Sequence, residues 1–353
     1  MGWRKKLSFG WALVKARALG EIRPLFVQIS VTNRCNARCH YCDYRERYSE
    51  ELSTEELFHI IDQLAELGTK RIFLWGGEPL VRNDIGRIIN YIRQKGIHCG
   101  LNTNGYLVPQ KIEEIKNLNQ ITLSIDGDKK AHDANREPGS YDKAIEAVKV
   151  VRAAGIPLYT CVPLTKYNVS DYQIDYMLDE AEKYGYSVGI IILKHPTEIL
   201  RNAWKYMASD DQVRHALRKV IREKKKGRPT HFSTLSYCDS LAWPDYSIQR
   251  IMADEDIKTI TDSRNVRGPK CWAGRLSFLI DTNGDVYPCA ASTVATMRHI
   301  NALDVGVKRA LEYVSKHNCQ ACFTPCRIEY NYLLSLNPRV LLNLARSYYE
   351  TGY

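Results

Sequence analysis

The sequence lacks the features that mark membrane-spanning, secreted and nucleic-acid-binding proteins. No apolar run reaches the roughly 18 residues that a transmembrane helix requires. The N-terminus has no uninterrupted apolar core of the kind found in secretory leaders, so we expect a cytoplasmic protein. No segment resembles a nucleic-acid-binding module, and we therefore expect no nucleic-acid partner.

Eleven cysteines are present, although no secretory leader is visible. In a reducing cytoplasm, so many thiols are typical of metal sites rather than disulfides. The chain has 353 residues, which favours one large and one small domain. Its formal net charge of +10 indicates anionic partners, such as a phosphorylated substrate, an acidic peptide or a membrane surface.

Three of the cysteines follow a short apolar segment, residues 24–32, that predicts a buried strand. Cys35, Cys39 and Cys42 have the spacing C-x3-C-x2-C, and no fourth cysteine lies nearby. A 4Fe–4S cluster held by three thiolates keeps one iron open for an exogenous ligand. The alternatives are a zinc site, which would need four protein ligands, and unrelated reactive thiols.

Glycine and polar residues follow at the ends of the next predicted strands. They are Gly76, Gly77, Glu78, Pro79, Asn104, Ser124 and Asp126. The two glycines let a backbone approach a ligand closely, and a buried glutamate can accept hydrogen bonds from an ammonium group. Ser124 and Asp126 can bind ribose hydroxyls or a carboxylate. Asn168 comes just after the fifth predicted strand, where it could contact the same ligand.

Strand-like and helix-like segments alternate over residues 25–200, in about six βα units. This alternation predicts an α/β fold in which a parallel sheet curls into an incomplete barrel. The cysteines and the polar motifs would then meet at the carboxyl-terminal edge of that barrel, where α/β proteins usually place their chemistry.

A second set of thiols predicts another metal site near the C-terminus. Its members are Cys271, Cys289, Cys319, Cys322 and Cys326. The first two flank a pair of strand-like segments joined at Asn283-Gly284, which is a strong hairpin signal. Such a hairpin brings two distant thiols together, and a zinc ribbon is the alternative to an Fe–S site. The remaining Cys99, Cys161 and Cys238 lack partners at ligand spacing, and we expect the first two to be small core residues.

The first 24 residues form a basic amphipathic segment. Its apolar side chains recur at helical spacing at Trp3, Leu7, Trp11, Val14 and Ala18. A helix of this kind can lie in a membrane interface, or it can pack its apolar stripe against the barrel.

The cysteine spacing, with Tyr41 before the last cysteine, resembles the cluster loop of the radical S-adenosylmethionine (SAM) superfamily. Residues 76–79 resemble that family's GGEP motif, and His132-Asp133 with Arg136 resemble a later family segment. The resemblance implies a partial (β/α)6 barrel in which SAM chelates the open iron. One-electron reduction then cleaves SAM to methionine and a 5′-deoxyadenosyl radical, which removes a hydrogen atom from the substrate.

The C-terminal cysteines, with Gly284 ahead of Cys289, resemble the small cysteine-rich SPASM and twitch extensions that carry auxiliary Fe–S clusters. This implies one auxiliary 4Fe–4S cluster, with Cys326 either spare or substituting for one of the other four thiols. The implied domains are an N-terminal segment (1–24), the radical SAM barrel (25–200), a connecting helical region (201–262) and a SPASM/twitch domain (263–353).

By resemblance, the site residues fall into two groups. The cofactor contacts are Tyr41, Gly76, Gly77, Glu78, Pro79, Asn104, Ser124, Asp126, Arg136 and Asn168. The metal ligands are Cys35, Cys39, Cys42, Cys271, Cys289, Cys319, Cys322 and Cys326, with four of the last five holding the auxiliary cluster.

The implied activity is oxidation or rearrangement of a small-molecule or lipid-linked substrate, with an auxiliary cluster that aids electron transfer. The expected partner is a reductant such as flavodoxin or ferredoxin, and residues 1–24 would add peripheral membrane contact at the cytoplasmic face. One alternative is a maturase that modifies a ribosomal peptide. Another is a non-catalytic Fe–S scaffold or electron carrier, which the GGEP motif disfavours because a scaffold needs no SAM site.

Overall fold

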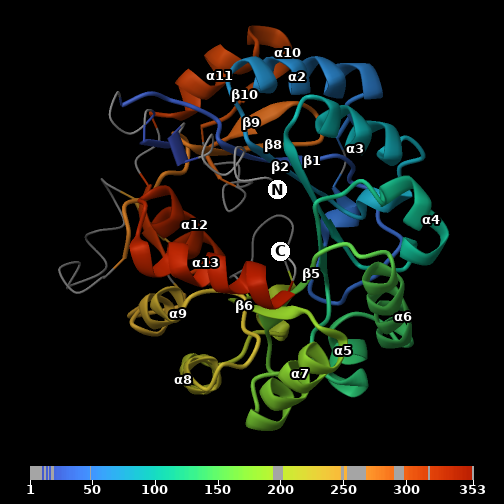
Figure 1. The fold of residues 1–353 in the computed structure, drawn as a ribbon, viewed down its shortest axis with the longest axis vertical. Helices are drawn as coiled ribbons and strands as arrows, with labels where there is room; N and C mark the ends of the chain where they lie inside the picture. The colour runs from blue at the N-terminus through green and yellow to red at the C-terminus, as the bar shows by residue number, and fades with distance from the viewer. Residues whose placement is uncertain are drawn as a thin grey trace.

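Six parallel strands form the centre of this computed structural model (Figure 1). The structure describes residues 10, 11, 13, 14, 16, 20–47, 49–193, 202–247, 250–252, 268–289, 298–316 and 319–351. The strands are β1 (Phe26–Ser30), β2 (Arg71–Trp75), β3 (His98–Thr103), β4 (Gln120–Leu123), β5 (Leu158–Leu164) and β6 (Ser187–Ile192). Each pairs in parallel with the next strand along the chain. The predicted α/β fold with a curved parallel sheet is therefore confirmed.

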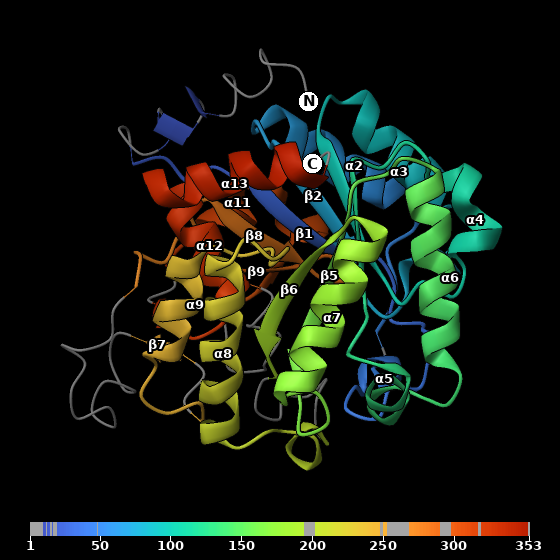
Figure 2. The same ribbon diagram turned by 60° about the horizontal axis from the view of Figure 1, so that its bottom comes forward.

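Helices connect these strands and cover the outer face of the sheet (Figures 1 and 2). They are α2 (Thr54–Glu66), α3 (Ile85–Gln94), α4 (Val108–Ile115), α5 (Lys129–Asn135), α6 (Ser140–Ala153) and α7 (Asp171–Tyr184). Three short 3-10 helices are η1 (Tyr44–Glu46), η2 (Pro79–Val81) and η3 (Ala203–Lys205). The ends follow local signals: Ser53 and Glu56 form a capping box before α2, and Gly185, with φ of 70°, ends α7.

Alternate residues of each strand face the helices or the interior of the barrel. In β1, Val27 and Ile29 belong to the buried cluster beneath the helices. The intervening Gln28 bonds instead to a C-terminal arginine. Cys99 is fully buried in the main cluster, as predicted, whereas Cys161 is only half-buried. Polar residues therefore point into the barrel, while its outer face is apolar.

The C-terminal part extends the same sheet rather than forming a separate one. Its hairpin consists of β8 (Ser277–Ile280) and β9 (Asp285–Tyr287), with Gly284 at φ of 91° in the turn. β8 pairs in parallel with β1, and β10 (Ile300–Asn301) pairs with β9. The strand order is β10-β9-β8-β1-β2-β3-β4-β5-β6. The predicted boundary at residue 263 thus separates segments that share one sheet, and the domain limits stay a prediction.

The other C-terminal elements surround the barrel, where some pack against its outer helices and others lie beside its last strand. They are α8 (Asp210–Lys225), α9 (Thr234–Leu241), β7 (Arg250–Met252), α10 (Ala302–Val305), α11 (Val307–Val314), β11 (Cys319–Cys322), α12 (Pro325–Leu334) and α13 (Pro338–Thr351). β7 and β11 form a second, two-stranded antiparallel sheet. α12 contacts both α9 and β6, so it closes the barrel beside its last strand (Figure 1).

The N-terminal segment is described only in part, and Trp3, Leu7 and Ala18 of its predicted stripe lie outside the described residues. Leu13 and Ala16 are buried, whereas Trp11 and Val14 are exposed. Among the described residues of this segment, the buried side chains therefore do not belong to the predicted stripe. No helix within the described ranges combines the length and apolar character needed to cross a membrane.

Candidate functional site

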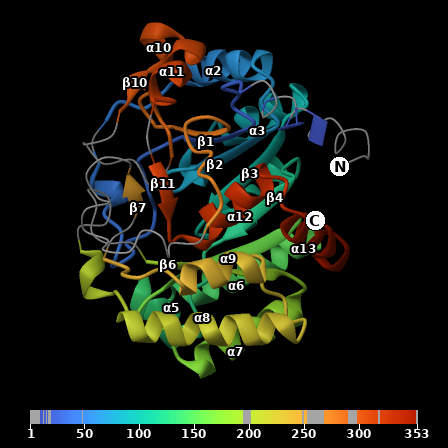
Figure 3. The same cartoon turned by 90° about the vertical axis from the view of Figure 1, so that its left-hand side faces the viewer.

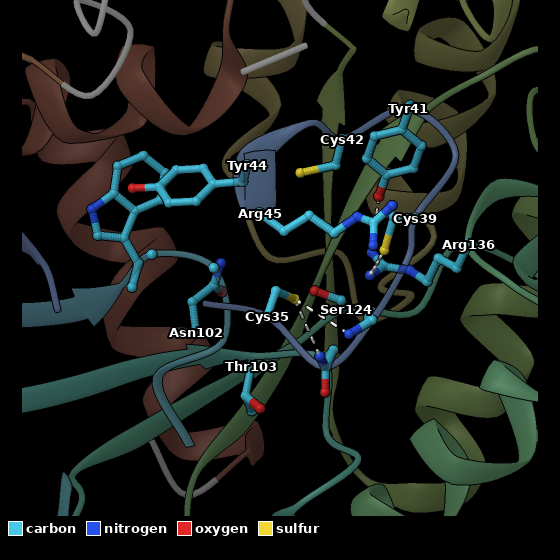
Figure 4. A pocket seen from close by; sticks show the side chains of 15 residues that line it. Cys35, Cys39, Tyr41, Cys42, Tyr44, Arg45, Asn102, Thr103, Ser124 and Arg136 are labelled. Atoms are coloured by element: carbon cyan, nitrogen blue, oxygen red, sulfur yellow. Dashed lines mark hydrogen bonds between the residues drawn. The ribbon is translucent and has the colours of Figure 1, made fainter. Parts of the chain in front are cut away.

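The cysteine loop, residues 33–47, lies at the carboxyl end of β1 and borders a cavity of about 160 Å³ (Figure 4). The lining residues are Cys35, Ala37, Cys39, Tyr41, Cys42, Tyr44, Arg45, Trp75, Gly76, Gly77, Asn102, Thr103, Asn104, Ser124 and Arg136. The structure thus brings the three thiols together with residues that follow β2, β3 and β4. Tyr41, Gly76, Gly77, Asn104, Ser124 and Arg136 were predicted from the sequence and line this cavity.

Some lining residues were not predicted. Tyr44 and Arg45 follow the last cysteine by two and three positions, and Figure 4 shows the Arg45 side chain pointing into the cavity. Asn102 lies two residues before Asn104, so strand alternation was the signal that could have placed it on the barrel's inner side. Trp75 ends β2, and no local signal in the sequence assigned its ring to the cavity.

The two glycines of the GGEP motif hold the cysteine loop against the sheet. A Cβ on Gly76 would lie 2.4 Å from the carbonyl oxygen of Thr32, and one on Gly77 would lie 2.3 Å from that of Arg34. Gly76 also has φ of 141°, which favours glycine. The Gly77 N–H donates to Thr32 O (2.8 Å), and the Glu78 N–H donates to Arg34 O (2.9 Å). Both glycines are therefore needed for a close approach within the protein itself.

Glu78 is buried behind the cavity wall, where it joins the GGEP segment to the end of β3. Its Oε1 accepts from the Thr103 hydroxyl (2.7 Å) and the Leu80 N–H (3.0 Å). Its Oε2 accepts from the Asn104 N–H (2.7 Å). Burial raises the pKa of the Glu78 carboxyl to about 7, although these hydrogen bonds oppose the shift. Pro79 is also buried and starts η2, so it does not reach the cavity.

The thiols of the cysteine loop are largely enclosed by the protein, although each keeps some exposure. Burial raises the pKa of Cys35 to about 11 and that of Cys42 to about 12. Burial also raises the pKa of Cys39, although the guanidinium of Arg136 opposes it. The free thiols are therefore protonated at neutral pH, and a bound metal has to displace those protons.

A buried ion pair between Arg136 and Asp126 lies on the other side of the cavity. Arg136 donates from Nε to Asp126 Oδ2 (2.8 Å) and from Nη2 to Asp126 Oδ1 (3.1 Å). The same guanidinium contacts the Tyr41 hydroxyl (3.0 Å) and Cys39 Sγ (3.6 Å). Asp126 is fully buried and does not line the cavity. In this structure its carboxylate is paired with Arg136 and Tyr41, and its contact with the cofactor stays a prediction.

His132 and Asp133, the residues ahead of Arg136, have structural partners. His132 Nδ1 accepts from the Asp126 N–H (3.1 Å), and burial lowers the pKa of His132 to about 4, so the ring is neutral. The Asp133 carboxylate accepts from the Gly139 N–H, the Ser140 hydroxyl and the Tyr141 N–H, each at 2.9 Å. Asp133 thereby caps the start of α6.

Asn168, predicted to contact the cofactor, is fully buried and does not border the cavity. Its amide donates to Asp126 O (2.9 Å) and Pro163 O (3.0 Å), and its oxygen accepts from the Thr165 N–H (2.7 Å). These bonds fix the loop after β5 to the end of β4. In this structure the Asn168 side chain therefore forms hydrogen bonds with backbone groups, which is a common role of asparagine in loops.

The C-terminal thiols converge from three segments. The Gly274 N–H donates to Ser277 O (2.9 Å) and Pro288 O (3.0 Å), so the segments carrying Cys271 and Cys289 lie side by side. Contact with the Cys319 thiol lowers the pKa of Cys271 below its ordinary value. β11 supplies Cys319 and Cys322, and the first turn of α12 supplies Cys326.

Arg327 is the cation within this second group of thiols. Nearby Cys289, Cys326 and Cys322 raise its pKa further above the ordinary arginine value. Its Nη2 donates to Oε1 of Gln28 on β1 (2.6 Å), so the C-terminal thiols adjoin the barrel interior.

Residues 29–178 match the family described as the Radical SAM superfamily. The AdoMet-dependent heme synthase of Nitratidesulfovibrio vulgaris is 31% identical over 175 residues, and the GTP 3′,8-cyclase of Campylobacter fetus is 33% identical over 177 residues. Each alignment covers 47% of this chain, and 47% and 54% of those proteins, respectively. The chain thus spans about half the length of the curated relatives it matches.

Two solved structures share the fold over more of the chain. SuiB of Streptococcus suis bound to S-adenosylmethionine has a TM-score of 0.64 at 17% identity, covering 85% of this chain and 68% of that one. anSMEcpe with bound AdoMet also has a TM-score of 0.64, at 15% identity, covering 92% of this chain and 100% of that one. The shared fold therefore extends well beyond residue 178. The part of this chain that matches the radical SAM superfamily is therefore residues 29–178, which carry the cysteine loop and the GGEP motif.

Proposed function

We propose that this chain is a radical SAM enzyme whose cleaving 4Fe–4S cluster is held by Cys35, Cys39 and Cys42. One observation carries the proposal: these three thiols border a single cavity beside Gly76 and Gly77, and no fourth cysteine is among its described lining residues. Three thiolates leave one iron of a cube open for an exogenous ligand. When bound, the reduced cluster and SAM supply a 5′-deoxyadenosyl radical that removes a hydrogen atom from the substrate.

The residues suit a cluster better than a single metal ion. Within the described ranges, no three His, Cys, Asp or Glu side chains gather closely enough to hold one ion. A cube offers its irons at separate corners, so its thiolates lie farther apart than the four ligands of a zinc ion. The spread of the three thiols around a cavity supports this assignment.

The chain's own side chains would orient SAM in the cavity. Glu78 Oε2 accepts one hydrogen bond in the structure and keeps capacity for the ammonium group of SAM. Asn104 and Ser124 line the cavity and would contact the ribose or the carboxylate. Arg136 carries positive charge next to Cys39, which stabilises the thiolate that a metal requires.

We further propose one auxiliary 4Fe–4S cluster, held by four of the five C-terminal thiols. The contact between Cys271 and Cys319 and the grouping of the other three thiols around Arg327 support this site. We place the substrate between the two groups of thiols. The hydrogen bond from Arg327 to Gln28 supports this position, because it connects the auxiliary site with strand β1 of the barrel.

For the substrate class, our first candidate is a small molecule or a lipid-linked compound that undergoes oxidation or rearrangement. The curated relatives named above, a heme synthase and a GTP cyclase, favour small molecules. The second candidate is a ribosomal peptide, favoured by SuiB bound to precursor peptide SuiA and anSMEcpe bound to the Cp18Cys peptide. The proposed electron donor is flavodoxin or ferredoxin. The proposed contact of residues 1–24 with a membrane draws support from the exposed side chains of Trp11 and Val14.

The test is reductive SAM cleavage by the anaerobically reconstituted protein. With dithionite, the wild type should release 5′-deoxyadenosine, and Cys39→Ala should abolish the release. Cys238→Ala is the matched control, because Cys238 is an exposed cysteine on α9 and belongs to neither predicted ligand set. If wild type and Cys39→Ala release equal amounts, the cleaving site has been placed wrongly. If the wild type binds iron but releases none, the scaffold alternative is favoured.

A further inference from the structure

Large exposed apolar side chains gather at one end of the molecule, on the N-terminal helical segment and on α13. They are Trp11 (71% exposed), Val14 (43%), Leu341 (38%), Leu342 (63%) and Leu344 (41%). These five make up half of the large apolar side chains that are exposed within the described ranges. Such a concentration marks an interaction surface, whereas single exposed leucines are ordinary.

A small buried core lies between the N-terminal segment and the turn that precedes α13. Leu13 and Ala16 of the N-terminal segment pack in one buried cluster with Trp272 and Leu334, and Leu336 lies against it. Leu336 is in the turn that leads from α12 into α13. Figures 2 and 3 show the N-terminal segment and α13 at the same end of the molecule. The exposed side chains of Trp11 and of the α13 leucines therefore belong to two segments at the same end of the molecule.

The surroundings of these side chains are positively charged. Residues 338–346 contain two arginines, Arg339 and Arg346, both exposed, and no acidic residue. Lys270 lies over the Trp272 ring at 4.7 Å and adds a third cation near the shared core. A symmetric contact with a second copy of the chain would place like charges against each other, which is unfavourable. An anionic lipid surface can bury the leucines in its apolar layer and attract the arginines to its negative charge.

We propose that this face docks on an anionic lipid bilayer. We call it the basal surface and define it by Trp11, Val14, Arg339, Leu341, Leu342, Leu344 and Arg346. The proposal extends the membrane contact of residues 1–24 to α13, and it specifies how the barrel is oriented when docked.

The basal surface lies opposite the cysteine loop. Asn343 of α13 donates to His231 O (3.2 Å), and the His231 ring stacks on Tyr159 at the amino end of β5 (4.0 Å between centroids). The cysteine loop follows the carboxyl end of β1, at the other end of the parallel strands. A strand of six residues spans roughly 20 Å. Docking therefore holds the cavity away from the bilayer, so the reacting group of the substrate has to reach it through water.

The experiment is flotation of the full-length protein with vesicles made of equal parts phosphatidylcholine and phosphatidylglycerol, or of phosphatidylcholine alone. The wild type should bind the anionic vesicles more tightly. Leu342→Asn should weaken partitioning about tenfold, because a leucine loses its apolar burial. Arg346→Gln should weaken it about fivefold. The controls are Leu303→Asn and Trp204→Ala, exposed apolar residues on α10 and η3, which should bind like the wild type.

Several outcomes would overturn the proposal. The first is a wild-type protein that does not bind anionic vesicles. The second is vesicle binding that Trp11→Ala reduces but that Leu342→Asn and Arg346→Gln leave unchanged. A change of oligomeric state in Leu342→Asn without vesicle binding would instead assign the surface to a second copy of the chain. SAM cleavage measured on the same samples separates the two proposals, because every basal variant should keep it. If the wild-type protein does not cleave SAM, the proposed enzyme activity is wrong. Lipid docking would then be judged from the flotation result alone.

Discussion

Gly77→Ala should remove the cleaving cluster while leaving the auxiliary site filled. The new Cβ would lie 2.3 Å from Arg34 O and 2.7 Å from Asn33 O, both backbone atoms of the cysteine loop. An ordinary contact needs about 1 Å more, so the loop has to move by roughly that amount. This movement breaks the hydrogen bonds of Gly77 N–H to Thr32 O and of Glu78 N–H to Arg34 O. We expect a loss of about 1–3 kcal/mol in the free energy of unfolding, which is typical of overpacking.

The assay is iron content after anaerobic reconstitution, combined with thermal unfolding. Two cubes correspond to about eight iron atoms in the wild type, and Gly77→Ala should keep about four. Gly268→Ala is the matched control, because no atom of the described residues lies within 4 Å of the Cβ position and the backbone there is not left-handed. A Gly77→Ala protein with full iron and wild-type stability would refute the view that this close approach holds the cysteine loop in place.

Two other predictions concern buried charges. Arg136→Gln leaves the Asp126 carboxylate buried without its partner, so chemical denaturation should show a loss of about 3–5 kcal/mol. Adding Asp126→Asn should restore part of that loss; a double variant that loses the sum of both single effects would contradict the pairing. Because burial raises the pKa of Glu78 from 4.5 to about 7, the native state binds more protons than the unfolded state in this range. The free energy of unfolding of the SAM-free protein should therefore fall, by up to about 3 kcal/mol, as the pH rises from 4.5 to 7, and Glu78→Gln should flatten that slope; an equal slope in both proteins would contradict it.

The barrel could be predicted because its signals are local and repeat. Each of the six strands is a short apolar run, and each helix between them carries caps or periodic apolar residues, such as Ser53 and Glu56 around α2. Parallel order then follows from the alternation of strand and helix. The pairing of β8 with β1 has no such signal, because it joins residues about 250 positions apart. The sequence therefore carried no sign that the C-terminal hairpin joins the sheet of the barrel.

The motifs of the site could be predicted from the sequence. Which of their side chains reach the cavity and which bond to other parts of the protein could not. Asp126 and Asn168 are typical ligand-binding residue types at strand ends, yet the structure commits them to Arg136 and to backbone carbonyls. Arg45 carries no motif, and only the folded loop directs it into the cavity. In the N-terminal segment, helical spacing fitted the stripe through Trp11 and Val14. The structure buries the alternative face through Leu13 and Ala16, because their partners Leu334 and Trp272 come from the far end of the chain.

In our proposal, the three-cysteine site presents an iron to which SAM binds. Its most direct test is the electron paramagnetic resonance spectrum of the dithionite-reduced protein with and without SAM. It should be recorded on a Cys319→Ala/Cys322→Ala variant, which removes the signal of the auxiliary site. We expect a cluster signal that changes when SAM is added and that disappears with a further Cys39→Ala change. A signal that SAM leaves unaltered, or one that survives Cys39→Ala, would contradict it.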